Sequence, residues 1–256
     1  MTVIEVKPSV ARQFSRASKR YHKAATVQQQ VGRNLLAYNP VRKAPVAIDL
    51  GCGPGSFAPA LASVAEQLFA IDLSPAMLQQ CRLASDKVVA IQGDAQYLPF
   101  TDNSVDLIFS SLALQWVSDL NSVFEEAQRV LKPGGSLVFS CVMEGSLWQL
   151  KKSWLKVDDY DHVNRFASVA SLEQSITQAK LHKAIGVVRP HTFWYPDIKS
   201  LFASIRDVGA NTVIGAKRKG LIGRQLWQKF HQAYEGYRTD EGLPLTYQIY
   251  YGVVSK

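Results

Sequence analysis

The chain has 256 residues, of which 47% are hydrophobic and 20% charged. This composition is typical of a single globular domain, too apolar for a disordered chain and without the roughly 20 uninterrupted apolar residues of a membrane span. The first residues do not resemble a secretory signal, and the 3 cysteines form neither a CxxC pair nor a zinc-type cluster. We therefore expect a cytoplasmic protein with no membrane contact and no metal.

The net charge of +8 is divided unevenly along the chain. Residues 1–43 hold nine basic residues and one acid, residues 44–139 four and ten, and residues 140–256 sixteen and ten. This division favours an acidic middle that binds a cationic ligand, between basic ends that meet an anionic partner. A solvated basic surface would give the same charges.

The middle of the chain alternates between strand and helix patterns. We predict strands at 46–50, 68–71, 88–92, 105–110 and 136–142, with helices at 56–66, from Ser74-Pro75 onward and at 120–131. Repeated strand–helix units predict an α/β fold with a doubly wound parallel sheet and helices on both faces.

Beyond residue 143 this rhythm breaks. Amphipathic stretches at 147–156 and 171–181 predict a helical lid insertion over the sheet. A strand at 184–195, helices at 197–208 and 221–237 and a last strand near 247–254 then follow. We divide the single domain 1–256 into a basic N-terminal helical segment (1–43), a cofactor-binding core (44–142), the lid (143–182) and a C-terminal part that completes the sheet (183–256).

The most specific local pattern is the glycine-rich sequence from Asp49 to Gly55, where a predicted strand turns into a helix. Glycines there allow positive φ and let a ligand approach the backbone. Nicotinamide and flavin nucleotides are held by similar loops, but their fingerprint has a third glycine where this chain has Ser56. Asp49 would also repel a pyrophosphate and favour a ligand with an amino group.

Acids recur at the ends of the next two predicted strands. An acid in the position of Asp72 can accept both hydroxyls of a ribose, and one in the position of Asp94 can accept an adenine amino group. Together with Asp49, these positions describe a cationic aminoacyl adenosine.

With these motifs the chain resembles the class I S-adenosylmethionine-dependent methyltransferases. The resemblance implies a Rossmann-like, mostly parallel seven-stranded sheet and S-adenosylmethionine as cofactor, with S-adenosylhomocysteine as product. The three loop glycines would border the methionine part, and Met77 would lie against the adenine. The cofactor-binding residues implied are Asp49, Gly51, Gly53, Gly55, Asp72, Leu73, Met77, Asp94, Ala95 and Ser110.

The residues after the fourth predicted strand bear on what is methylated. Residues 110–117 contain neither the Asn/Asp-Pro-Pro-Tyr motif of base amino-group methyltransferases nor a Pro-Cys nucleophile, and they offer no general base. A carboxylate, with a pKa of about 4, is ionised at neutral pH and needs none. The alternative is a base from the lid or beyond, where His162 and His191 stand.

Across nearly its full length the chain resembles the malonyl-[acyl-carrier protein] O-methyltransferases of the biotin pathway. The matching segments are 14–17 with Tyr21, 114–116, 145–147, 162–166, 208–210, 220–224 and 243–247. The resemblance implies methylation of the free carboxylate of a malonyl thioester. We expect Tyr21 to close over the methyl donor, Gln115 and Trp116 to line the acceptor pocket, and Arg165 to hold the carboxylate.

The partner implied is an acyl carrier protein whose malonyl group hangs on a phosphopantetheine arm. Such carriers are acidic, which suits the basic ends of this chain. Nucleic acid is an alternative partner that we rank lower. Among functions, a methyltransferase for another small acid or a lipid intermediate stays open. An RNA methyltransferase and a noncatalytic cofactor-binding protein rank lower. The candidate carrier contacts are Arg12, Arg16, Lys19, Arg20, Lys23, Lys217, Arg218, Lys219 and Arg224.

Overall fold

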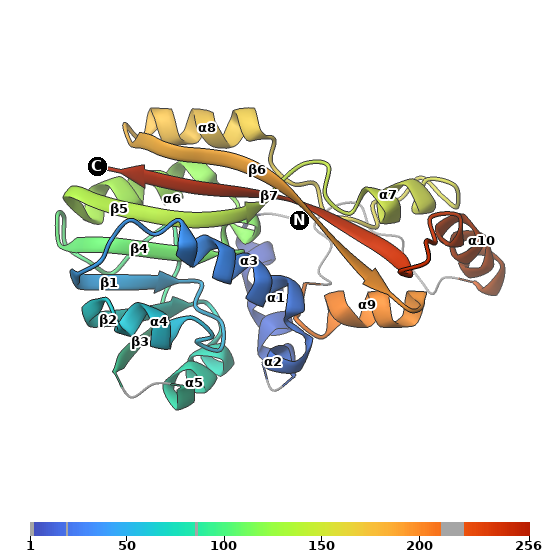
Figure 1. Cartoon of the computed structure of the whole chain (residues 1–256), viewed down its shortest axis with the longest axis horizontal. Helices are drawn as coiled ribbons and strands as arrows, with labels where there is room; N and C mark the ends of the chain where they lie inside the picture. The colour runs from blue at the N-terminus through green and yellow to red at the C-terminus, as the bar shows by residue number, and fades with distance from the viewer. Residues whose placement is uncertain (1–2, 19, 85–86, 211–222) are drawn as a thin grey trace.

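A single sheet organises the computed structural model, which describes residues 3–18, 20–84, 87–210 and 223–256 (Figure 1). Its strands are β1 (Ala44–Leu50), β2 (Ala65–Asp72), β3 (Val88–Gln92), β4 (Val105–Ser111), β5 (Leu131–Val142), β6 (His182–Tyr195) and β7 (Leu243–Ser255). Their order is β3-β2-β1-β4-β5-β7-β6, with β7 antiparallel to both neighbours and the pairs from β3 to β5 parallel. The predicted doubly wound, mostly parallel seven-stranded sheet is confirmed.

Helices cover both faces of this sheet. The helices are α1 (Val3–Ala17), α2 (Tyr21–Ala24), α3 (Thr26–Ala37), α4 (Ala58–Ala62), α5 (Pro75–Ala84), α6 (Leu120–Val130), α7 (Trp148–Trp154), α8 (Val169–Gln178), α9 (Ile198–Arg206) and α10 (Arg224–Glu235), with a 3₁₀ turn at Leu114–Trp116. On one face, Leu35 of α3 and Leu61 of α4 join a buried cluster with Phe109. On the other, Phe124 of α6 packs edge to face on Phe139. No described helix is both long enough and apolar enough to span a membrane.

One predicted helix is much shorter than the pattern indicated. The prediction of a helix over 56–66 was wrong at its end, because α4 stops at Ala62 and Ala65 already belongs to β2. Parallel pairing of Ala65 with Ala44 extends the strand toward its start. Ala, Glu and Gln there carry little strand preference of their own, so tertiary pairing decides.

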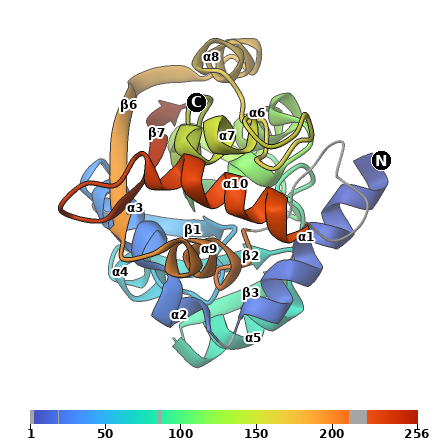
Figure 2. The ribbon, with the colours of Figure 1, turned by 90° about the vertical axis from the view of Figure 1, so that its right-hand side faces the viewer.

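The β6–β7 hairpin is longer than the rest of the sheet. Its two strands pair from His182 and Ser255 as far as Tyr195 and Leu243, whereas β7 pairs with β5 only up to Ile249. Residues 190–195 and 243–248 therefore form a two-stranded arm that extends past the sheet, with α7, α9 and α10 around it (Figures 1 and 2). The arm has a buried core of its own, made of Leu150, Trp154, Ile198, Leu201, Phe230, Tyr234, Leu243 and Leu245.

The segment predicted as a lid is divided between two places. Helix α7 contributes to the arm core. Helix α8 instead lies on the sheet, where its Leu172 and Ile176 join the cluster of α6 and β5. A lid role stays a prediction for the first part of residues 143–182 only.

Candidate active site

The glycine-rich loop follows β1 and presents its backbone to a cavity. Gly51 has φ +70°, and a Cβ there would lie 2.3 Å from Cβ of Ala113, so both backbone conformation and space require glycine. The Asp72 carboxylate fixes the loop, since Gly53 N donates to Oδ2 at 2.9 Å and Ser74 N donates to Oδ1 at 2.8 Å.

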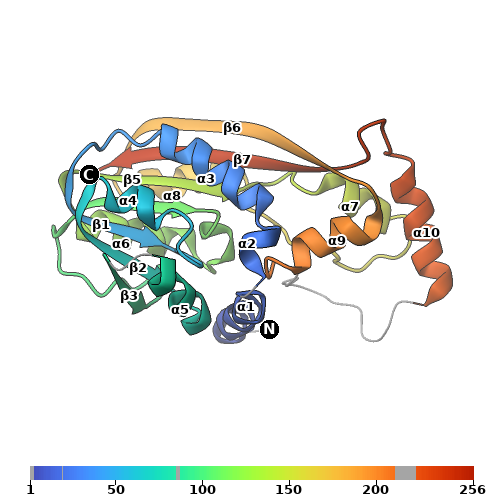
Figure 3. The same cartoon turned by 60° about the horizontal axis from the view of Figure 1, so that its bottom comes forward.

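This first cavity, the strand-end cavity, measures about 800 Å³. Helices α1 and α2 lie across the strand ends and close it (Figure 3). Two contacts hold this cover: the hydroxyls of Ser15 and Ser74 are 2.8 Å apart, and Phe14 meets Trp116 edge to face at 5.5 Å. The lining includes Phe14, Tyr21, Gly51, Gly53, Asp72, Leu73, Gly93, Asp94, Ala95, Ser111, Leu112 and Trp116.

A smaller inner pocket beside the glycine loop gathers hydrogen-bond acceptors. Asp49 is 2% exposed and its Oδ2 has no hydrogen-bond partner; Oε1 of Gln28 and Oγ of Ser56, which line the same pocket, have none either. Burial and the neighbouring Asp72 raise the pKa of Asp49 to about 7. Three unsatisfied oxygens, one of them on a buried carboxyl, call for a cationic donor, and an ammonium group supplies three N–H bonds.

Most predicted cofactor residues meet at these two cavities. Gly51, Gly53, Asp72, Leu73, Asp94 and Ala95 line the strand-end cavity, and Asp49 lines the inner pocket. The sequence does not indicate a binding role for Gln28 or Ser56. Ser56 enters only as a departure from the dinucleotide fingerprint, and Gln28 lies on α3, which reaches the site only through the fold.

Three predicted cofactor residues are not in the lining. Gly55 packs against α5, where an added Cβ would lie 2.8 Å from Sγ of Cys81. Met77 is buried within α5. Ser110 donates to the Leu50 carbonyl at 2.9 Å, and Ser111 lines the cavity in its place because successive side chains of a strand point to opposite faces.

A second cavity, the arm cavity, adjoins the first and measures about 1170 Å³. Tyr21 and Trp116 line both cavities and so stand between them. Gln115 lines the arm cavity; its Nε2 donates to the Leu112 carbonyl at 2.6 Å, and its Oε1 is buried without a partner. The rest of the wall is mainly apolar and includes Val27, Leu147, Leu150, Trp154, Phe166, Phe202, Ile205, Val208 and Tyr247.

The arginine and the two histidines considered as acceptor-binding or basic residues lie in three different places. The side chain of Arg165 is 83% exposed, pairs with Asp161 at 3.4 Å and does not line the arm cavity, so the structure does not bring it to the expected carboxylate site. His162 lines the cavity, stacked on Trp154, with Nε2 2.7 Å from an oxygen of Asp158. His191 of β6 shares a hydrogen bond with the Tyr251 hydroxyl of β7 and lines neither cavity.

Comparison with known proteins agrees with this geometry. Residues 48–139 match a family model described as "Methyltransferase domain". A malonyl-[acyl-carrier protein] O-methyltransferase from Yersinia pestis is 33% identical over 248 residues, 97% of this chain and 91% of that protein. The chain belongs to the S-adenosylmethionine-dependent methyltransferases.

A longer curated protein and a solved structure are also similar to this chain. The biotin biosynthesis bifunctional protein BioHC of Cellvibrio japonicus is 38% identical over 255 residues, 98% of this chain, but the chain spans only 50% of that protein's length. A putative methyltransferase from Bacillus halodurans superposes with a TM-score of 0.64 at 19% identity, covering 88% of this chain and 97% of that chain. The second likeness shows the methyltransferase fold.

The residues present fit the cofactor that this family implies. The unpartnered Oδ2 of buried Asp49 suits the ammonium of the methionine part, and carboxylates at two strand ends suit a nucleoside. Within the described ranges, no three His, Cys, Asp or Glu side chains gather as a metal site would need.

Proposed function

We propose that this methyltransferase transfers the methyl group of S-adenosylmethionine to the free carboxylate of a malonyl thioester on an acyl carrier protein. The product would be a malonyl methyl ester for biotin synthesis. The proposal is supported by the Yersinia pestis relative, whose name states that reaction and which matches nearly the whole chain. The Cellvibrio japonicus relative is named for biotin biosynthesis as well.

The cofactor would lie across the strand-end cavity and the inner pocket. Asp49, Gln28 and Ser56 accept from its ammonium. Each oxygen of Asp72 already accepts one backbone N–H and keeps a lone pair for a ribose hydroxyl, and Asp94 with Ala95 meets the adenine. When bound, the cofactor supplies an electrophilic methyl group on a sulfonium.

Among the described residues no imidazole lines the strand-end cavity, and this is the observation that carries a carboxylate acceptor. His162 lines the arm cavity only, with its ring stacked on Trp154 and its Nε2 bonded to Asp158. Burial and nearby Asp72 raise the pKa of Tyr21, which keeps it a neutral phenol. A carboxylate, with a pKa of about 4, has no proton to lose at neutral pH, so alignment and exclusion of water suffice.

The two cavities define where acceptor and donor meet. Tyr21 and Trp116, shared by both walls, would flank the attacking oxygen and the methyl carbon, and Gln115 would line the acceptor side. The arm cavity is much larger than a malonyl group. Its apolar wall would also take the thioester and the first part of a phosphopantetheine arm.

Four of the proposed carrier contacts have exposed side chains. Arg12 and Arg16 lie on α1, Arg20 directly before α2 and Arg224 at the start of α10, and an acidic carrier would complement them. The predicted contacts Lys19, Lys217, Arg218 and Lys219 lie outside the described residues, as does the side chain of Lys23.

A methyl-labelling experiment tests the function. The protein is incubated with labelled S-adenosylmethionine and, in parallel, with malonyl carrier protein, malonyl coenzyme A, glutaryl carrier protein, free malonate or RNA. We expect a base-labile label on malonyl carrier protein, and much less of it with Asp49→Asn when the cofactor concentration is near the wild-type Kd. Preferential labelling of RNA or of another acid would refute the proposal, as would cofactor binding without transfer to any acceptor.

A further inference from the structure

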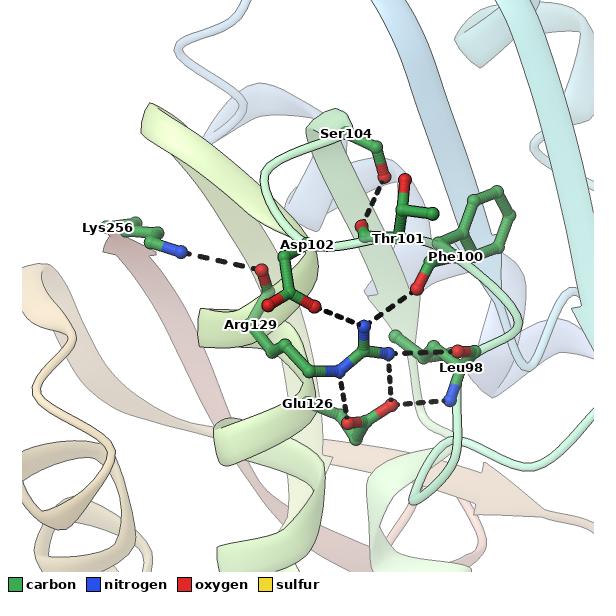
Figure 4. A network of polar contacts seen from close by, with 8 residues as sticks. All are labelled: Leu98, Phe100, Thr101, Asp102, Ser104, Glu126, Arg129 and Lys256. Carbon is green, nitrogen blue, oxygen red and sulfur yellow. Dashed lines mark hydrogen bonds and ion pairs between the residues drawn. The ribbon is translucent and has the colours of Figure 1, made fainter.

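One arginine outside both cavities ties the loop after β3 to helix α6. The Arg129 guanidinium makes five hydrogen bonds, matching its five N–H groups (Figure 4). Nη1 donates to the Phe100 carbonyl at 2.7 Å and to Asp102 at 2.9 Å, and Nη2 donates to the Leu98 carbonyl at 3.0 Å. Nε and Nη2 also hold the Glu126 carboxylate at 2.7 and 2.8 Å.

Glu126 completes the attachment one helical turn earlier. Its Oε2 accepts from Leu98 N at 2.7 Å, so both backbone polar groups of Leu98 bond to this pair. The Arg129 carbonyl accepts from Asn103 N at 3.0 Å. The charged pair therefore fixes the loop at several successive points, with charge-assisted bonds that are stronger than neutral ones.

The network fixes the loop rather than the helix. Helix α6 has its own apolar attachment to the sheet through Val123, Phe124 and Ala127, each at most 1% exposed. The loop has apolar anchors too, in Leu98, which is 5% exposed, and in Phe100, which meets Phe69 edge to face at 5.1 Å, but the polar backbone groups of both residues bond to the charged pair. Without Arg129 the helix would keep its place, and the loop would keep its apolar contacts but lose the bonds that fix the course of its backbone.

We propose that Arg129 is a positioning residue for the adenine end of the cofactor site. It lines no cavity itself, but the loop that it holds begins with Gly93, Asp94 and Ala95, which form the cavity wall. Through Leu98 and Phe100 it sets where Asp94 and Ala95 stand. The proposal rests on the assignment of the strand-end cavity to the cofactor. A lysine cannot replace Arg129 fully, because a single ammonium cannot reach acceptors spread across a planar fork.

The test compares Arg129→Gln with a matched arginine. Arg82→Gln removes another arginine-to-carbonyl bond in the same half of the sheet, from Nη2 to the Ala90 carbonyl at 3.1 Å, without touching the loop. Binding of S-adenosylhomocysteine and of 5′-methylthioadenosine is measured by calorimetry. We expect both Kd values to rise about tenfold in Arg129→Gln, the cost of ordering roughly one residue on binding, and to stay unchanged in Arg82→Gln.

Two further readouts separate positioning from general stability. Hydrogen exchange of the amides of residues 96–103 should quicken in Arg129→Gln while that of α6 stays protected, and the acceptor KM at saturating cofactor should not change. Arg129→Lys should fall between wild type and Arg129→Gln, and it serves as the folded variant if the glutamine variant does not fold.

An unchanged Kd in a folded Arg129 variant, or an equal rise in Arg82→Gln or in the acceptor KM, would overturn the positioning role. Failure of the wild-type protein to bind S-adenosylhomocysteine would overturn the cofactor assignment and this role together. The two failures are thus distinguished by the wild-type measurement alone.

Discussion

Replacing Asp49 by asparagine should stabilise the free protein and weaken its cofactor binding. The pKa of Asp49 is about 7 in the folded protein against 3.8 ordinarily, a difference of about three units, so ionising this buried carboxyl costs the fold about 4 kcal/mol at most. Between pH 4 and 7 the folded state binds more protons than the unfolded state, because the carboxyl of Asp49 is still protonated only in the folded state. The free energy of unfolding therefore falls as pH rises and levels off above pH 7. Asparagine carries no such penalty.

Urea unfolding of wild type and Asp49→Asn between pH 4 and pH 8 measures this effect. The stability advantage of the variant should grow by up to about 1.4 kcal/mol per pH unit and become constant above pH 7. With saturating S-adenosylhomocysteine this advantage should shrink by about 2.7 kcal/mol, because the variant has lost the charge that pairs with the ammonium and should bind about 100-fold more weakly.

A matched control comes from Asp106, which lies at the opposite end of the strands and pairs with Lys132 at 2.8 Å. Asp106→Asn should lose stability and keep its affinity for S-adenosylhomocysteine. The reasoning about Asp49 would be refuted if its variant gained no stability between pH 5 and pH 8, or if it bound S-adenosylhomocysteine within about twofold of wild type.

The remaining predictions concern the same site. Cofactor binding should release about one proton at pH 6 and almost none at pH 8, since the ammonium lowers the raised pKa of Asp49. Calorimetry in buffers of different ionisation enthalpy measures the number of protons released, and equal release at both pH values would contradict this prediction. Tyr21→Phe keeps a ring between the two cavities and should retain kcat within about tenfold, whereas Tyr21→Ala should lower kcat about 100-fold in steady-state assays. Equal losses of kcat in the two variants would exclude a role for the ring. Arg165→Ala should change the KM for malonyl carrier protein by less than about twofold, because the side chain is exposed; a rise above about tenfold would show that its loop closes on the acceptor. Gly55→Ala should cost more stability than Gly53→Ala, by roughly 1–3 kcal/mol in urea unfolding, because both have positive φ but only Gly55 would clash, with Cys81.

Patterns that are local in the sequence predicted the sheet and half of the site well. The glycine loop and the acids at strand ends depend on a strand and the turn after it, so Gly51, Asp72 and Asp94 could be placed before the fold was known. Their meeting follows from parallel strands ending at one edge of a sheet.

Features that depend on distant packing could not be predicted in the same way. Gln28 reaches the inner pocket because α3 crosses the sheet, and Arg129 bonds to backbone 29 and 31 residues away, which no motif announces. Arg165 was chosen for its chemistry alone, and the fold leaves its side chain in solvent. The choice between Ser110 and Ser111 needed the register of β4, since one residue decides which face a side chain occupies.

The charges of the proposed reaction explain why the strand ends are covered. Donor and acceptor start as a sulfonium and a carboxylate and end as a neutral thioether and a neutral ester, so positive and negative charge disappear together. Water stabilises the separated charges more than the partly neutralised transition state, and a site that excludes water removes that advantage. In the proposed reaction Tyr21 and Phe14, which come from the N-terminal helices and line both cavities, would exclude it. Asp49 lies apart in the inner pocket, where it can keep its charge paired with the ammonium throughout the transfer.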